Sequence, residues 1–173
     1  MGLRLSWLGS LSDPGFPARE YEALRERLPQ STPFNSLAWL RAAEASLPAG
    51  QVLQILLGYE QAQLRLCLPL VRMPWRIGPL GFSVVRHLGY PLSDRIGLLI
   101  DLPETEAAAV LRAIRQHLPH SLLQLNEVTR GEPWLLHWGW RSSTHERRRA
   151  CNAPVHQLSA VSYTHLRAHE TRG

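Results

Sequence analysis

The stretch that decides the fold is Ser31-Thr32-Pro33-Phe34-Asn35-Ser36-Leu37-Ala38-Trp39-Leu40, in which an extended segment turns into a helix. Proline disfavours helical backbone in the residue before it, and the side chain of Asn35 or Ser36 can then cap the free amides of a new helix. Apolar residues recur at helical spacing from there and stop before Pro48. This pattern predicts a helix over residues 36–47.

The predicted helix is followed by two apolar stretches of strand character. Residues 52–57 and 64–71 alternate as strands do, and the second contains Leu66-Cys67-Leu68-Pro69-Leu70-Val71. Residues 58–62 between them are predicted to form a hairpin loop. Because proline has no amide hydrogen to donate, Pro69 is expected at a sheet edge, near a strand end or in a bulge.

Further elements are predicted on both sides of this core. They are a strand over residues 3–8, a helix over 17–28, a turn-rich segment over 74–81, a strand over 82–88, a turn over 89–94, a strand over 96–100, a helix over 104–118 and a strand over 121–128. Asp101 and Glu104 are predicted to form a capping box for the last helix. The elements alternate in an α/β manner within one domain over residues 1–140.

The C-terminal part of the chain differs in composition from this domain. Residues 141–160 are polar and rich in arginine, which is typical of a linker between domains. Residues 161–171 resemble the conceptual translation of a widely used transposase-type sequencing adapter, so we expect residues 161–173 to have no evolved fold. His165 and His169 stand four residues apart, as metal ligands on a helix do, but they fall in this tail and we assign no metal site.

Composition excludes several classes of chemistry within this segment. All 19 Lys and Arg residues are arginine, so a phosphate-binding loop with a lysine, a Schiff base and a Ser-Lys pair are excluded. Cys67 and Cys151 lack the spacing of a zinc site or a disulfide framework. No apolar run is long enough to cross a bilayer, and the N-terminus lacks the apolar core of a secretory signal. We therefore expect a cytoplasmic protein.

The basic charge raises a second possibility. The formal net charge is +5, and the densest cluster is Arg147-Arg148-Arg149. This cluster has no interleaved aromatic residues and belongs to no recognisable binding fold, which favours a solvated linker over a track for phosphates. Binding of nucleic acid is kept as a less favoured alternative.

The order of elements, the Pro-Phe-x-Ser-x-x-Trp-Leu helix at residues 33–40 and the Leu-Pro-Leu hairpin strand at residues 68–70 resemble the N-terminal half of CelD/BcsL-like proteins. That family belongs to the GNAT acyltransferase superfamily and is related to the FemAB peptidyl transferases. The resemblance covers about residues 1–158 and implies an α+β fold with a GNAT-like mixed sheet flanked by helices. It further implies that the chain is a truncated tandem protein of a bacterial cell, with a role in cellulose, exopolysaccharide or cell-envelope metabolism. The second GNAT-like half, which is missing, is then the half that binds acyl-CoA.

The resemblance also says where a cofactor would lie. In GNAT folds the pyrophosphate of acyl-CoA binds an Arg/Gln-x-x-Gly-x-Gly/Ala loop between the fourth strand and the next helix. The matching segment here is residues 101–106, which have no glycine, one proline and three carboxylates. Like-charge repulsion at this helix start would oppose a pyrophosphate. We therefore expect no acyl-CoA site in this chain, and acetyl-CoA or another acyl-CoA only in the full-length parent.

No catalytic residue is assigned from the sequence. The resemblance places Tyr90, Asp94, Arg95 and Trp39 in a groove for the acceptor substrate. Asp94 and Arg95 can equally form a turn cap or a surface pair, and Phe34 and Trp39 can equally pack the helix start. Two further functions stay open beside the acyltransferase half, a non-enzymatic module that binds a glycan or partner and a basic nucleic-acid-binding protein.

Overall fold

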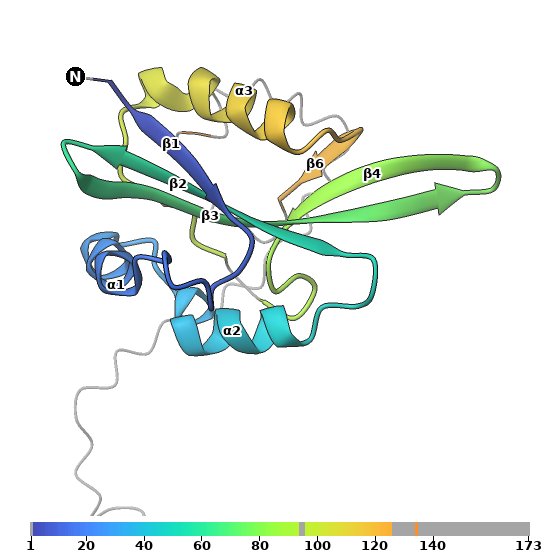
Figure 1. Ribbon diagram of the computed structural model, residues 1–173, viewed down its shortest axis with the longest axis horizontal. Coiled ribbons are helices and arrows are strands. Elements are labelled where there is room, and N and C mark those ends of the chain that lie inside the picture. The colour runs from blue at the N-terminus through green and yellow to red at the C-terminus, as the bar shows by residue number, and fades with distance from the viewer. Residues whose placement is uncertain (1, 94–95, 126–133, 135–173) are drawn as a thin grey trace, which may run out of the picture. The chain divides into compact units, whose positions relative to one another are not determined.

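A six-stranded mixed sheet organises the part of the chain that the structure describes, which is residues 2–93, 96–125 and 134 (Figure 1). In this computed structural model the chain divides into a unit of residues 1–140 and a unit of residues 141–173. The first unit holds the strands β1 (Arg4–Leu8), β2 (Val52–Glu60), β3 (Gln63–Ile77), β4 (Leu80–His87), β5 (Leu99–Ile100) and β6 (Leu122–Gln124). The predicted α+β class is confirmed.

The sheet order is β1-β2-β3-β4-β6, and β5 pairs with β3 beside this path. Neighbours from β1 to β4 are antiparallel, whereas β4 and β6 are parallel. The parallel pair is joined through α3 (Ala107–His117), as a crossover connection requires.

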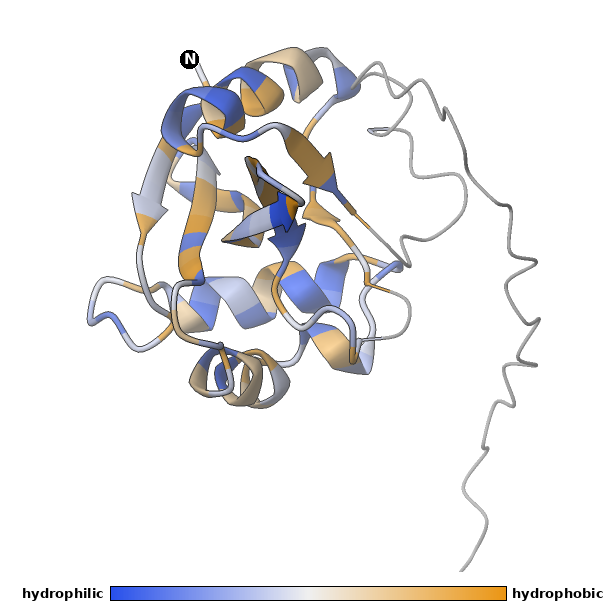
Figure 2. Ribbon diagram, turned by 90° about the vertical axis from the view of Figure 1, so that its right-hand side faces the viewer, coloured by the Kyte–Doolittle hydropathy of each residue, from blue (hydrophilic) through white to orange (hydrophobic). Residues whose placement is uncertain are grey.

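Helices cover both faces of the sheet (Figures 1 and 2). The helices α1 (Ala18–Arg27) and α2 (Leu37–Ala45) pack on one face, and α3 packs on the other. Each face has its own hydrophobic core, so β3 is buried on both sides. Leu66, Leu68 and Leu70 belong to the core under α3, while Cys67 and Val71 belong to the core under α1 and α2.

The position of Pro69 contradicts the expectation of an edge, a strand end or a bulge, because it lies in the middle of β3 opposite Ile55. Its carbonyl accepts a hydrogen bond from the amide of Leu88 at 2.9 Å, so its nitrogen also faces the β4 side of the strand. There the partner of β3 changes from β5, which pairs at Leu66 and Cys67, to β4, which pairs from Leu70 onward. The missing amide hydrogen therefore falls at a junction where no ladder bond is lost.

The hairpins are tighter than the sequence suggested. The predicted loop over residues 58–62 is a turn of two residues, Gln61 and Ala62, with φ of 51° and 64°. The predicted turn-rich segment over residues 74–81 instead belongs to β3 and β4, which meet at the turn Gly78-Pro79. Gly78 has a φ of 57°, a value that favours glycine at the first position of a two-residue hairpin turn.

The deciding stretch folds around one buried amide. Pro33–Asn35 form a 3₁₀ turn, and Ser36 then caps α2, its hydroxyl accepting from the amide of Trp39 at 3.3 Å. The side chain of Asn35 is 2% exposed and serves a different purpose. Its oxygen accepts from the Thr32 amide at 2.9 Å, and its nitrogen donates to the Gly97 carbonyl at 3.0 Å.

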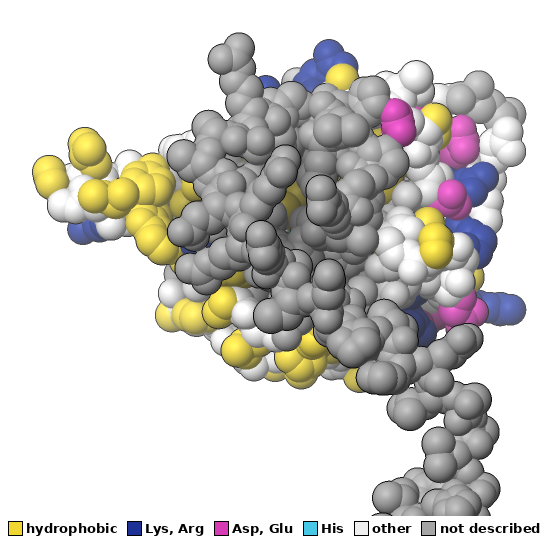
Figure 3. All heavy atoms as spheres, turned by 180° about the vertical axis from the view of Figure 1, so that it is seen from behind, with side chains coloured by type: hydrophobic (Ala, Val, Ile, Leu, Met, Phe, Trp, Pro, Cys, Tyr) yellow, Lys and Arg dark blue, Asp and Glu magenta, His cyan; other side chains and the backbone are white. Residues whose placement is uncertain are grey.

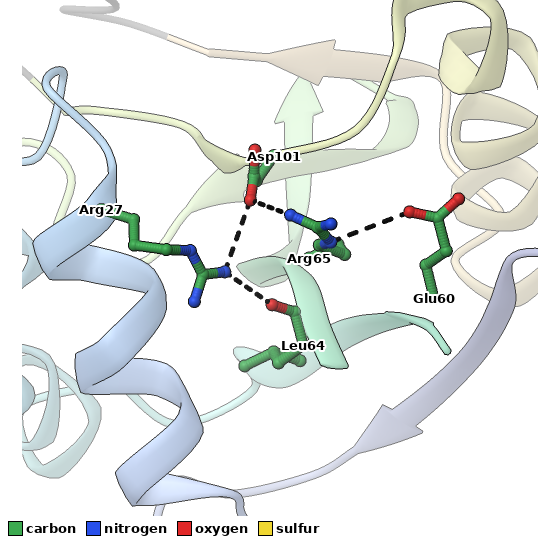
Figure 4. Close-up of polar contacts among 5 residues, drawn as sticks. All are labelled: Arg27, Glu60, Leu64, Arg65 and Asp101. Carbon is green, nitrogen blue, oxygen red and sulfur yellow. Dashed lines mark hydrogen bonds and ion pairs between the residues drawn. The ribbon is translucent and has the colours of Figure 1, made fainter. Parts of the chain in front are cut away.

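The segment before α3 corrects two predictions. The predicted strand over residues 96–100 is only the two residues of β5. Asp101 forms no capping box with Glu104, because its carboxylate accepts from Arg65 at 2.6 Å and from Arg27 at 3.4 Å (Figure 4). A 3₁₀ turn over Glu104–Glu106 leads into α3 instead. The predicted strand over residues 121–128 contains β6, and its residues 126–128 lie outside the described part.

Gly97 offers a sharp test of this packing. A Cβ atom at Gly97 would stand 2.1 Å from the carbonyl oxygen of Gln30 and 3.1 Å from the side-chain oxygen of Asn35. Because the nearest atom belongs to the backbone, the Gly97→Ala variant is expected to lose about 1–3 kcal/mol of unfolding free energy. Urea denaturation measures this loss. Gly81→Ala is the matched control, since nothing lies within 4 Å of its Cβ position; equal stability of the two variants would contradict the packing described.

Candidate functional site

A pocket of about 400 Å³ lies where α2, the stem of the β3–β4 hairpin and the turn after β4 meet. Most of its lining side chains are apolar or aromatic, and Arg86 is the one charged residue among the described residues that line it. The lining comprises Trp39, Ala42, Ala43, Ser46, Leu47, Pro48, Gln51, Val71, Met73, Arg86, His87, Gly89, Tyr90, Pro91 and Leu92.

Two of the four predicted groove residues come together here. Trp39 contributes from α2 and Tyr90 from the turn after β4, and both line the pocket. Asp94 and Arg95 lie outside the described residues, so their assignment stays a prediction.

Trp39 fixes the turn to the helix. Its indole nitrogen donates to the hydroxyl of Ser93 at 2.9 Å, and Ser93 is 1% exposed. Its ring meets Phe34 edge to face, with 5.2 Å between ring centroids. Trp39 therefore packs the helix start and lines the pocket at the same time, so the two interpretations of this residue do not exclude each other.

Gly89 lets the turn approach this tryptophan. Its φ is 95°, and a Cβ atom there would stand 2.3 Å from the Ser93 hydroxyl and 3.2 Å from the Trp39 indole nitrogen. Only glycine combines this backbone conformation with such a close approach. The turn is thus shaped to bring Tyr90 over the pocket.

Arg86 is held at the pocket by aromatic rings. Its guanidinium lies over the ring of Tyr90 at 4.6 Å and over the ring of Trp75 at 5.0 Å. Its Nε donates to the side-chain oxygen of Gln124 on β6 at 3.0 Å. Cation–π contacts of this kind orient a guanidinium without neutralising its charge. Arg86 therefore presents a fixed positive charge with further N–H donors at the pocket wall.

His87 adds no second charge. It is 4% exposed, and its Nδ1 lies 2.7 Å from the carbonyl oxygen of Leu88. Burial lowers the pKa of this imidazole to about 4, so the ring is neutral at pH 7. The positive character of the pocket wall at neutral pH comes from Arg86.

The resemblance to GNAT folds implies a different segment for a pyrophosphate loop once the strands are known. The predicted strand over residues 96–100 precedes α3, but the fourth strand along the chain is β4, which ends at His87. The spacing Arg86-x-x-Gly89 fits the first four positions of the GNAT pattern. Pro91 stands where that pattern has Gly or Ala, so the match is incomplete and lacks one amide hydrogen.

Four amides of this turn, those of Leu88, Tyr90, Leu92 and Ser93, already donate to carbonyls of the protein. Those of Leu92 and Ser93 donate to the carbonyl of Gly89 at 2.8 and 3.0 Å, and that of Leu88 donates to Pro69 at 2.9 Å. The amide of Tyr90 donates to His87 at 3.4 Å. A pyrophosphate site needs amides that point at the ligand. These four amides point at backbone carbonyls instead.

Other histidines and the described cysteine of this domain have structural contacts. His117 stacks on Trp7 with 4.2 Å between ring centroids and lies 2.8 Å from the Gln54 side-chain oxygen. His120 contacts the carbonyl of Leu118. Cys67 is buried, and burial raises the pKa of its thiol, which keeps it protonated and unreactive. The predicted cluster Arg147-Arg148-Arg149 lies outside the described residues.

No protein-family model, curated protein or solved structure matches this chain. The chemistry of the site is therefore the basis for assigning a function. Over residues 2–93, 96–125 and 134, no three or more His, Cys, Asp or Glu side chains are grouped to hold a metal ion. Over the same residues, no helix is both long and apolar enough to span a bilayer.

Proposed function

We propose that this domain recognises an acceptor substrate with an apolar face and an anionic group, as the first half of an acyl-CoA-dependent N- or O-acyltransferase of polysaccharide or cell-envelope metabolism. The observation that carries the proposal is the pocket in which Arg86 is fixed between Tyr90 and Trp75. The order of strands and helices, together with the parallel pair β4 and β6, supports the GNAT-like part of the proposal.

The pocket suits a small amphipathic ligand. Its volume of about 400 Å³ lies in the range of small-molecule sites, which are mostly apolar with a few placed polar groups. Trp39 and Tyr90 provide aromatic surface for the apolar face of a sugar ring. Arg86 can form paired, charge-assisted hydrogen bonds to a phosphate or carboxylate. A phosphorylated or carboxylated sugar is therefore the class of acceptor that we expect.

The acyl-CoA itself is assigned to a second GNAT-like half that follows the predicted linker at residues 141–160. Four amides of the turn after β4 donate to carbonyls of the protein. At the start of α3, Glu104 and Glu106 bring negative charge to the end of the helix that attracts anions. In the full-length parent, the acceptor held by the first half would attack the thioester carbonyl directly. A non-enzymatic glycan- or partner-binding module would use the same pocket.

Calorimetry with glucose 1-phosphate and with glucose tests the pocket. Wild-type chain is expected to bind the phosphorylated sugar more tightly than glucose, and Arg86→Gln is expected to weaken that binding roughly tenfold or more, because one charge-assisted contact is worth about 1.5–3 kcal/mol. Arg112→Gln is the control, since Arg112 is an exposed arginine on α3, across the sheet from the pocket. Equal binding of the two sugars, or equal loss in both variants, would refute the assignment.

A separate titration addresses the cofactor. Acetyl-CoA added to the full chain is expected to give no saturable heat at micromolar concentrations, because the turn after β4 and the start of α3 offer no amide cradle. The Arg86→Gln variant should behave identically in this titration. Micromolar binding of acetyl-CoA by wild-type chain would show that the cofactor belongs to this half.

A further inference from the structure

The hairpin of β3 and β4 continues past the edge of the sheet as a free ribbon (Figure 1). The pairing of β2 with β3 ends at Val52 and Arg72, whereas β3 and β4 stay paired to Ile77 and Leu80. Five residues per strand therefore extend beyond β2, which corresponds to about 17 Å at the rise of a β-strand. Pro74 is tolerated here because its nitrogen faces the edge that β2 has left.

The register gives this ribbon two different faces. Trp75 lies opposite Phe82, and Ile77 lies opposite Leu80, so these four side chains share one face. Trp75 is 39% exposed, Ile77 63% and Leu80 68%. Arg76 alternates with them and points to the other face of the ribbon, and Arg72 lies on that same face at the base of the ribbon, opposite Val52; both are exposed. The hairpin is therefore amphipathic, with an apolar face and an opposite face that carries two arginines.

Charge along this part of the chain has one sign. Residues 61–93 contain four arginines and no aspartate or glutamate. Figure 3 shows hydrophobic side chains gathered at the end of the ribbon. Apolar side chains backed by arginines, without carboxylates, are complementary to a surface that is apolar beneath and anionic on top, as a leaflet of anionic lipids is.

We propose that the β3–β4 ribbon docks the domain onto an anionic membrane surface. Trp75, Ile77, Leu80 and Phe82 enter the boundary between headgroups and acyl chains, while Arg72 and Arg76 contact lipid phosphates from the opposite face. The apolar side chains sit at the far end of a two-stranded ribbon, which is narrow enough to sink into a leaflet but offers a protein partner little area.

The pocket lies on the side that would face the lipid. Met73 lies on the apolar face of the ribbon and lines the pocket, Arg86 lines the pocket from the same face of the sheet, and Leu92, which is 73% exposed, lies at the pocket as well. Docking would therefore bring the pocket close to ligands presented at the membrane. The docking proposal rests on the ribbon alone and stands whether or not the pocket binds the acceptor class proposed above.

Co-sedimentation of the full chain with vesicles tests the proposal. Wild-type chain is expected to pellet with vesicles of phosphatidylcholine and phosphatidylserine at 3:1, and much less with phosphatidylcholine alone. The Ile77→Ser/Leu80→Ser variant is expected to lower the partition coefficient at least about tenfold, because two apolar side chains no longer leave water. Arg72→Gln/Arg76→Gln should weaken binding and reduce its dependence on salt.

Val52→Ser is the matched control, since Val52 is an exposed apolar residue that precedes the ribbon and lies on the other face of the sheet. Thermal unfolding followed by circular dichroism shows whether each variant is folded. If the Ile77→Ser/Leu80→Ser variant is not folded, the single variant Leu80→Asp replaces it. Equal pelleting with neutral vesicles, no pelleting, or pelleting unchanged by the tip variants would overturn the proposal. So would a wild-type dimer, seen by light scattering, that the tip variants convert to monomer, because the ribbon would then bind a second copy.

Discussion

The buried side-chain amide of Asn35 is the contact on which the arrangement of this domain depends. The side-chain amide joins the Thr32 amide to the carbonyl of Gly97. The backbone carbonyl of Asn35 accepts a hydrogen bond from the hydroxyl of Tyr21 on α1 at 2.5 Å. A buried polar group without partners costs about 1–3 kcal/mol, so these segments are held in one relative position. Because Ser36 begins α2 immediately afterwards, the same contact sets where Trp39 stands.

The long strand β3 then connects the core to the site. Its first part is buried on both faces, Pro69 marks the change of partner from β5 to β4, and its last part leaves the sheet as one side of the ribbon. The pocket lies where the ribbon departs from the body, and Arg86 reaches Trp75 on the ribbon and Tyr90 on the turn. The pocket thus lies at the junction of the core and the projecting ribbon.

Local patterns predicted the helices well, because periodicity and capping act within one segment, as α3 and the Ser36 cap of α2 show. They failed where distant segments decide the outcome. Cross-strand pairing lengthened β3 and β4 through a stretch rich in proline and glycine, and Arg65 and Arg27 drew Asp101 away from a capping role. Trp39 and Tyr90, which the resemblance named as groove residues, both line the pocket. Arg86 was not among the predicted residues, although its Arg-x-x-Gly spacing to Gly89 is visible in the sequence.

Hydrogen exchange in the Asn35→Ala variant tests most directly whether the buried amide positions the pocket. If the Asn35 amide positions the pocket, amide exchange in this variant quickens about tenfold or more in residues 32–46, 88–93 and 96–98. The strands β2 and β3 keep their protection. Binding of glucose 1-phosphate weakens. Gln116→Ala, on the exposed side of α3, should change none of these. Unchanged exchange in those three segments, or an equal rise across the whole sheet, would contradict the account.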